Sequence, residues 1–205
     1  MEKELKTGTT TVGLIFKDGV VIAADKKSTM GYMVDSKVSK KIYKIDSHIG
    51  MTIAGSVGDA YALVRILKAQ FSLYKLERGS ITMQAASTLL SNILHGSKWY
   101  PYMNQFILAG FDRRGAHIYS FDPLGGFDTF DKYYSTGSGS PFAYGALESE
   151  FKENMPLEDA IKLAVKSVKV AIERDIASGG KGITVAVVTK DGFEELSESD
   201  IKKYM

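Results

Sequence analysis

The chain has 205 residues, of which 44% are hydrophobic and 24% charged, a balance that excludes a disordered chain and predicts a folded globular protein. A chain of this length buries one substantial core, so we expect a single folded domain. The net charge is +2, and because basic residues are spread among acidic ones, no nucleic-acid partner is indicated.

The first quarter of the chain predicts a sheet. Thr9–Phe16 and Val20–Asp25 are rich in β-branched residues and flank an Asp-Gly turn, a pattern typical of a β-hairpin. Further strands are predicted at Met33–Lys37, Lys41–Ile45 and Gly50–Gly55.

The periodicity then changes to that of helices. Apolar residues recur every three to four positions from Asp59 to Glu77, and again from about Thr82 to His95. Strand patterns return at Gln105–Phe111, His117–Phe121 and Thr129–Tyr134.

A second pair of helices and a last strand complete the chain. The helices are predicted at Pro141–Lys152 and Leu157–Arg174, the strand at Ile183–Thr189, and a short polar helix near Glu198–Tyr204. Blocks of strands followed by pairs of helices, twice over, indicate an α+β fold. We expect a four-layer αββα sandwich of two antiparallel sheets covered by helix pairs, in place of regular βαβ alternation.

The composition excludes several chemistries. Without cysteine the chain has no disulfide, thiolate metal site or cysteine nucleophile. His48, His95 and His117 are scattered and match no metal-binding spacing, and no phosphate-binding glycine motif is complete, so we expect neither metal nor cofactor. No apolar stretch reaches the roughly 18 residues of a membrane span, and the first eight residues are polar. We therefore expect a cytoplasmic protein without membrane contact.

The junction between Gly8 and Thr9 is the strongest remaining candidate for chemistry. A threonine hydroxyl needs a base to take its proton, and a free α-amine, with an ordinary pKa of about 7.7–8.0, is available near neutral pH. Cleavage after Gly8 would create that amine on Thr9, and glycine leaves the preceding carbonyl open to attack by the Thr9 hydroxyl. Taken alone, the threonine run is also typical of an ordinary strand start.

Five motifs, taken in order, carry a resemblance that covers nearly the whole chain. They are Thr7-Gly8, Thr9-Thr10-Thr11-Val12-Gly13, Met51-Thr52-Ile53-Ala54-Gly55 with Gly58-Asp59, Ser135-Thr136-Gly137-Ser138-Gly139-Ser140, and Arg174-Asp175 with Ser178-Gly179-Gly180. In order and spacing they resemble archaeal-type proteasome β subunits, self-processing threonine proteases of the N-terminal-nucleophile hydrolase class. The resemblance implies the same αββα sandwich. It also implies a propeptide of residues 1–8, removed between Gly8 and Thr9, and one catalytic domain of residues 9–205.

The resemblance also assigns catalytic roles. Thr9 is the nucleophile, and Asp25 and Lys41 lie 16 and 32 positions beyond it, where the family has its acidic and lysine partners. An ammonium near the Thr9 oxygen favours the deprotonated hydroxyl, and a carboxylate holds that ammonium in place. Lys40 is the alternative, because a register slip of one residue would turn Lys41 to the other face of its strand. Lys26 and Lys27 are read as surface lysines.

Further residues are matched to supporting roles. Ser138, Asp175 and Ser178 correspond to the group that orients the α-amine, and the backbone N–H of Gly55 to the donor that stabilises the oxyanion. The positions expected to line the substrate pocket are Ser28, Thr29, Ser39, Tyr43, Ile53 and Val57. Its apolar floor suggests cleavage after large apolar residues. Individually, each of these residues is also compatible with an ordinary turn, surface or core position.

The resemblance implies a proteolytic assembly. The family forms seven-membered β rings, two of them stacked between rings of α subunits, and a ring ATPase feeds in unfolded polypeptide. Two other readings stay open at this point: a catalytically silent ring subunit that keeps its Gly8–Thr9 bond, and a hydrolase of the same class. The latter would be a two-ring bacterial ATP-dependent threonine peptidase or a small-molecule amidase.

Overall fold

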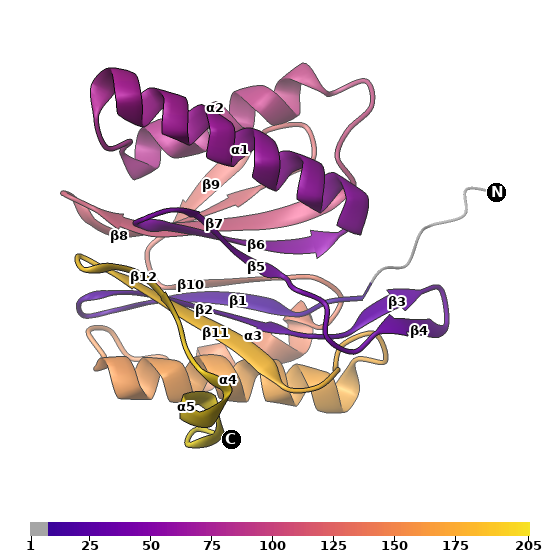
Figure 1. Cartoon of the computed structure of the whole chain (residues 1–205). Coiled ribbons are helices and arrows are strands. Elements are labelled where there is room, and N and C mark those ends of the chain that lie inside the picture. The colour runs from indigo at the N-terminus through magenta and orange to yellow at the C-terminus, as the bar shows by residue number, and fades with distance from the viewer. Residues whose placement is uncertain (1–7) are drawn as a thin grey trace.

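Two five-stranded antiparallel sheets lie face to face, with helices on both outer faces (Figure 1). The structure is a computed structural model, and it describes residues 8–205. The predicted α+β class and the four-layer arrangement are therefore confirmed. Of the predicted leader, residues 1–7 lie outside the described residues, so only Gly8 can be placed.

The first sheet carries both chain segments of the predicted N-terminal hairpin. Its strands, in spatial order, are β10 (Tyr133–Thr136), β1 (Thr11–Phe16), β2 (Gly19–Asp25), β11 (Ile183–Thr189) and β12 (Gly192–Glu195). The hairpin closes where Phe16 pairs with Gly19, so the predicted turn residues Lys17 and Asp18 form its tip. β1 and β2 are buried almost throughout, because the sheet is covered on both faces.

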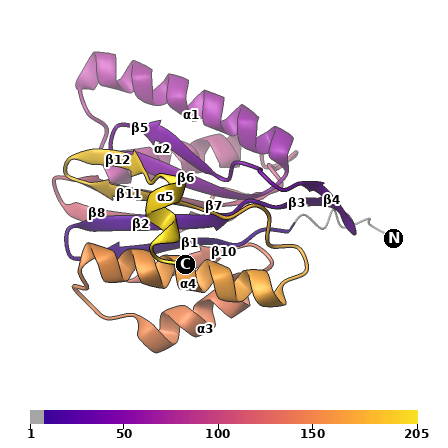
Figure 2. The same cartoon turned by 60° about the horizontal axis from the view of Figure 1, so that its bottom comes forward.

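Helices α3 (Ser140–Glu150) and α4 (Leu157–Arg174) cover the outer face of the first sheet. Figure 2 shows them side by side against that sheet, with α1 on the opposite side of the molecule. Pro141 stands in the first turn of α3, where a missing N–H costs no hydrogen bond. The short helix α5 (Glu198–Lys202) follows β12 and buries Ile201.

The second sheet is a meander in which each strand pairs with the next one along the chain. Its strands are β5 (Ile42–Asp46), β6 (Ile49–Gly55), β7 (Asn104–Asp112), β8 (Gly115–Phe121) and β9 (Phe127–Phe130). Helices α1 (Val57–Arg78) and α2 (Met83–Gly96) cover its outer face. The Thr82 side chain caps α2 by accepting a hydrogen bond from the N–H of Ala85 (3.2 Å).

The structure corrects the prediction of one strand at Thr129–Tyr134. The chain changes sheets there: β9 ends at Phe130 in the second sheet, and β10 begins at Tyr133 in the first. The predicted strand Met33–Lys37 is β4 (Met33–Ser36), which pairs with β3 (Ser28–Met30) in a largely exposed hairpin outside the two main sheets. β3 and β12 were not predicted, because strands of three and four residues carry little periodicity.

The layer between the sheets is apolar, except for a group of hydrogen-bonded hydroxyls at the start of β1. Val20 and Ile22 of the first sheet pack against Ile107 and Ile118 of the second. At the start of β1, three buried hydroxyls join the sheets: Thr11 Oγ1 lies 2.6 Å from Thr136 Oγ1 and accepts from Thr52 Oγ1 at 3.0 Å. We refer to Thr11, Thr52 and Thr136 below as the hydroxyl bridge.

Candidate active site

The antiparallel pairing of β1 with β2 brings the end of β2 beside the residues that precede β1. Thr11 pairs with Ala24, so Asp25 lies next to Thr10, with which it exchanges two hydrogen bonds. The Thr10 N–H donates to Asp25 Oδ1 (2.9 Å), and the Asp25 N–H donates to Thr10 O (3.2 Å). The sheet register thus places the Asp25 carboxylate beside Thr10, the residue that follows Thr9.

Asp25 is fully buried and accepts four hydrogen bonds. Its Oδ1 accepts from Lys41 Nζ (2.6 Å) and from the Thr10 N–H, and its Oδ2 from the N–H groups of Gly179 (2.9 Å) and Lys27 (3.1 Å). Four donors around one carboxylate are what a buried negative charge requires.

Lys41 immediately precedes β5 and is 6% exposed. Burial lowers the pKa of its ammonium below the ordinary value of 10.5, while the Asp25 carboxylate acts in the opposite direction. Burial is the larger influence, so Lys41 is a lysine whose proton is more easily lost than that of a surface lysine.

The structure separates Lys41 from the neighbouring lysines. Lys40 forms an exposed ion pair with Glu195 (3.5 Å), although its side chain also reaches the rim of the cavity described below. Lys26 pairs with Glu198 (2.9 Å). Lys27 Nζ donates to the carbonyl oxygen of Ile176 (2.6 Å), so it fastens the loop after α4.

The bond between Gly8 and Thr9 lies within this group. The Thr9 hydroxyl donates to the carbonyl oxygen of Gly8 (2.6 Å), and Lys41 Nζ lies 3.4 Å from the same oxygen. On the other side, the Gly8 N–H donates to Thr29 Oγ1 (3.2 Å). A Cβ on residue 8 would lie 1.7 Å from the Cβ of Ala177, so only glycine fits here.

A second polar group surrounds the nitrogen of Thr9. Ser138 Oγ accepts from the Thr9 N–H (3.2 Å) and donates to Asp175 Oδ2 (2.6 Å), and Ser178 Oγ donates to the same carboxylate oxygen (2.6 Å). Gly137 has φ of +92°, and a Cβ there would lie 2.1 Å from Thr9 O. The turn between β10 and α3 therefore wraps the Thr9 backbone closely.

A cavity of about 650 Å³ opens beside Thr9. Besides Gly8, Thr9, Lys41 and Gly55, it is lined by the six positions expected from the sequence to form the pocket, namely Ser28, Thr29, Ser39, Tyr43, Ile53 and Val57. Gly55 ends β6 with φ of +140°, and a Cβ there would lie 2.2 Å from Met103 O, so a side chain is excluded at this point of the wall.

Several lining residues were missed by the sequence analysis. Met30 and Asp35 come from the β3–β4 hairpin, where Asp35 Oδ2 accepts from Ser28 Oγ (2.9 Å), and Met103 comes from the segment before β7. Thr10, which does not line the cavity, was named only within the threonine run of the sequence and was given no role of its own. No local sequence pattern marks these positions, because each depends on chain segments that meet only in the folded structure.

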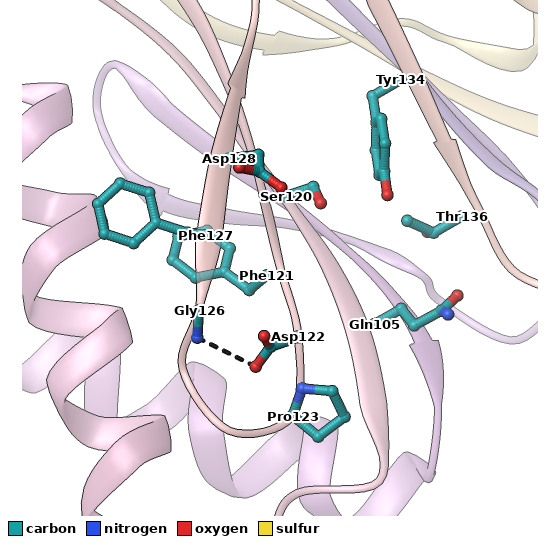
Figure 3. A pocket seen from close by; sticks show the side chains of 10 residues that line it. All are labelled: Gln105, Ser120, Phe121, Asp122, Pro123, Gly126, Phe127, Asp128, Tyr134 and Thr136. Atoms are coloured by element: carbon teal, nitrogen blue, oxygen red, sulfur yellow. Dashed lines mark hydrogen bonds between the residues drawn. The ribbon is translucent and has the colours of Figure 1, made fainter.

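A second cavity, of about 480 Å³, lies where β7 to β10 approach one another, and Figure 3 shows its aromatic rings and two carboxylates. It is lined by Gln105, Ser120, Phe121, Asp122, Pro123, Gly126, Phe127, Asp128, Tyr134 and Thr136. Gln105 connects this cavity with the site, because its Oε1 accepts from the Gly137 N–H (3.0 Å), next to Ser138. Thr136 belongs to the hydroxyl bridge.

Among residues 8–205, no three His, Asp or Glu side chains gather closely enough to hold a metal ion. Within the same range, no helix combines the length and apolar character needed to span a bilayer.

Comparison with known proteins gives a consistent result. A family model described as "Proteasome subunit" matches residues 5–188. A protein of Methanocaldococcus vulcanius named "Proteasome subunit beta" is 51% identical over 200 residues, covering 97% of this chain and 89% of the relative. Proteins of the same name from Methanoregula boonei (48% identical; 99% and 95% covered) and Methanococcus maripaludis (46%; 99% and 93%) are similar over the same extent.

Proposed function

Because the chain belongs to the proteasome subunit family, with β subunits as its similar relatives, we propose that it is a proteolytic β subunit whose nucleophile is the N-terminal threonine exposed by removal of residues 1–8. The observation that carries this proposal is the Thr9 hydroxyl, 2.6 Å from the carbonyl oxygen of the residue before it. It supports both self-processing and the later reaction.

Self-processing begins with attack of Thr9 Oγ1 on the carbonyl carbon of Gly8. The charge that develops on the Gly8 oxygen is stabilised by the Lys41 ammonium, 3.4 Å away. The C–N bond then breaks, the Thr9 nitrogen takes up the proton released by the hydroxyl, and an ester joins Gly8 to Thr9 Oγ1. Water hydrolyses this ester, which releases residues 1–8 and leaves a free α-amine.

Peptide hydrolysis uses that amine as the base. In the uncleaved chain the Thr9 nitrogen is an amide and cannot accept a proton, so activity requires processing. The freed amine takes the proton of Thr9 Oγ1, which attacks the substrate carbonyl and forms an acyl ester. The proton passes to the nitrogen of the departing peptide, and water then hydrolyses the ester, which releases the second product and restores Thr9. Lys41, held by Asp25, favours the deprotonated hydroxyl. We assign stabilisation of the oxyanion to the N–H of Gly55.

The cavity supports a preference for large apolar residues before the scissile bond. Tyr43, Ile53 and Val57 form apolar parts of its wall, and Met103 adds a flexible one. A volume of about 650 Å³ is within the range of pockets that hold a small ligand, so an aromatic or long aliphatic side chain fits.

The proposed assembly follows from family membership. We propose that the chain forms seven-membered rings, two of which stack between α-subunit rings, and that a ring ATPase supplies unfolded polypeptide. The names of the relatives support a proteasome particle. The expected cytoplasmic location stays a prediction.

The test is the intact mass and peptidase activity of the assembled protein. The wild type should lose residues 1–8 and cleave fluorogenic peptides with an apolar residue before the cleaved bond. Thr9→Ala should keep its full mass and show no activity, whereas Thr88→Ala, an exposed change on α2, should behave as the wild type. If the wild type keeps residues 1–8 and is inactive, the result would favour a silent ring subunit. If it hydrolyses small amides but no peptides, the result would favour another hydrolase of the same class.

A further inference from the structure

Thr10 contacts both polar groups of the site, and the proposed mechanism gives it no role. Its side chain and backbone are fully buried. The Thr10 N–H donates to Asp25 Oδ1 (2.9 Å), on the side of Lys41. The Thr10 hydroxyl lies 2.7 Å from Ser178 Oγ, on the side of Asp175.

The direction of the bond between Thr10 and Ser178 follows from counting hydrogens. Ser178 Oγ has one hydrogen and lies 2.6 Å from Asp175 Oδ2. An ionised carboxylate only accepts, so the Ser178 hydrogen points to Asp175. Ser178 Oγ must therefore accept from the Thr10 hydroxyl.

The same count applies on the other side of Asp175. The single hydrogen of Ser138 points to Asp175 Oδ2 (2.6 Å), so Ser138 Oγ accepts from the Thr9 nitrogen (3.2 Å). One chain of hydrogen bonds thus begins at the Thr10 hydroxyl, passes through Ser178 to Asp175, and meets there a second chain that begins at the Thr9 nitrogen. Both serine hydroxyls converge on one carboxylate oxygen.

The surrounding backbone holds the Thr10 hydroxyl in this position. A Cβ on Gly139 would lie 2.0 Å from Thr10 Oγ1 and 3.1 Å from Ser178 Oγ. The absence of a side chain on Gly139 is what leaves room for the hydroxyl. The neighbouring N–H of Gly139 donates to Thr9 O (3.2 Å), so the same residue contacts Thr9 and encloses Thr10.

We propose that the Thr10 hydroxyl is a positioning group for the reaction, because its bond to Ser178 holds one of the two hydroxyl donors on the Asp175 oxygen that also orients Ser138 toward the Thr9 amine. By donating to Ser178, it makes the Ser178 hydroxyl a stronger donor to Asp175. Asp175 in turn holds Ser138 as the acceptor of an amine N–H, which leaves the amine lone pair for the proton of Thr9 Oγ1. This inference rests on the proposed function.

The test compares Thr10→Val, which removes the hydroxyl at nearly constant shape, with Thr10→Ser, which keeps it. Both are made in the assembled protein, with removal of residues 1–8 verified by mass. We expect Thr10→Val to lower kcat about tenfold, the equivalent of one hydrogen bond of about 1.4 kcal/mol, with KM unchanged. Thr10→Ser should recover most of the rate. Thr184→Val, a buried threonine on β11, is the matched control and should keep the wild-type kcat.

The pH profile and a double variant separate positioning from a loss of packing. With a weaker Ser178 bond, the Asp175 carboxylate holds the ammonium form of the Thr9 amine more strongly, so the acid limb of kcat should move to higher pH in Thr10→Val. Because Thr10 acts through Ser178, a chain that carries both Thr10→Val and Ser178→Ala should have the same kcat as Ser178→Ala alone. If Thr10→Val does not mature, Thr10→Ala is compared with Thr10→Ser in its place.

Three results would overturn the inference: wild-type kcat and pH profile in Thr10→Val, a Thr10→Ser variant as slow as Thr10→Val, or fully additive losses in the double variant. Failure of the proposed function looks different. In that case the wild type itself shows no peptidase activity that depends on Thr9.

Discussion

Replacing Asp25 by asparagine should destabilise the protein as well as inactivate it. Asn keeps the shape of Asp but presents one oxygen and one NH₂ group. In the structure Oδ1 faces Lys41 and the Thr10 N–H, while Oδ2 faces the N–H groups of Lys27 and Gly179. Whichever way the amide turns, its NH₂ group meets two donors that then lose their acceptor.

The magnitude follows from these contacts. Each buried donor left without a partner costs about 1–3 kcal/mol, and breaking a buried ion pair by removing one partner costs about 3–5 kcal/mol. The two costs overlap, so we expect Asp25→Asn to lower the free energy of unfolding by about 4 kcal/mol. Lys41→Met should destabilise less than Asp25→Asn, because the Asp25 carboxylate loses its cation but keeps its three backbone N–H donors.

The assay is urea unfolding followed by circular dichroism at one protein concentration. All variants, and the reference protein, carry Thr9→Ala. Every chain then keeps residues 1–8, and the proteins differ only in the Asp25–Lys41 pair or at the control position. The control is Asp191→Asn in the exposed turn between β11 and β12, which should leave the unfolding midpoint unchanged. The reasoning is refuted if Lys41→Met destabilises as much as Asp25→Asn, or if Asp25→Asn unfolds at the wild-type urea concentration.

Two further predictions concern processing and pH. Gly8→Ala should block the release of residues 1–8, because its Cβ would lie 1.7 Å from the Cβ of Ala177 and also 2.6 Å from its backbone Cα. Ala177→Gly in the same chain should not restore release, since the backbone clash stays. Intact mass over time measures both variants, and release from Gly8→Ala at the wild-type rate, or full rescue by Ala177→Gly, would contradict this account. Peptidase kcat should fall as the pH rises through a value below 10.5, because the Lys41 ammonium is present below its lowered pKa and lost above it. A rate that stays level beyond 10.5, with circular dichroism unchanged, would speak against a role for this ammonium.

The fold could be predicted where the signal is local. The Asp-Gly turn predicted the β1–β2 hairpin, and helical periodicity predicted α1 and α4, because each pattern repeats within one element. The division of Thr129–Tyr134 between two sheets could not be predicted in this way. Only two residues, Asp131 and Lys132, separate β9 from β10, and the position of each strand is decided by distant pairing partners.

The site shows the same division. The spacing of Thr9, Asp25 and Lys41 could be matched to a family, and the structure places these residues in contact through the Gly8 carbonyl and the Asp25 carboxylate. Thr10 was overlooked because its partner Ser178 is 168 positions away, and a buried threonine in a strand gives no other sign in the sequence. Met103 was missed because only the fold brings the segment before β7 to the wall of the cavity.

The hydroxyl bridge has a mechanical consequence. Asp25 ends β2 of the first sheet, and Thr9 and Ser138 lie next to its strands β1 and β10, whereas Gly55 ends β6 of the second sheet and Lys41 precedes its strand β5. The proposed catalytic groups therefore come from both sides of the apolar layer between the sheets. Apolar packing is non-directional, so it specifies the alignment of the two sheets less sharply than a hydrogen bond does. The hydrogen bonds among Thr11, Thr52 and Thr136 hold the two sheets in one relative position, since hydrogen bonds tolerate little misalignment. These three hydroxyls therefore fix how the two sheets are aligned close to the site, and with it the distance between the groups that each sheet contributes.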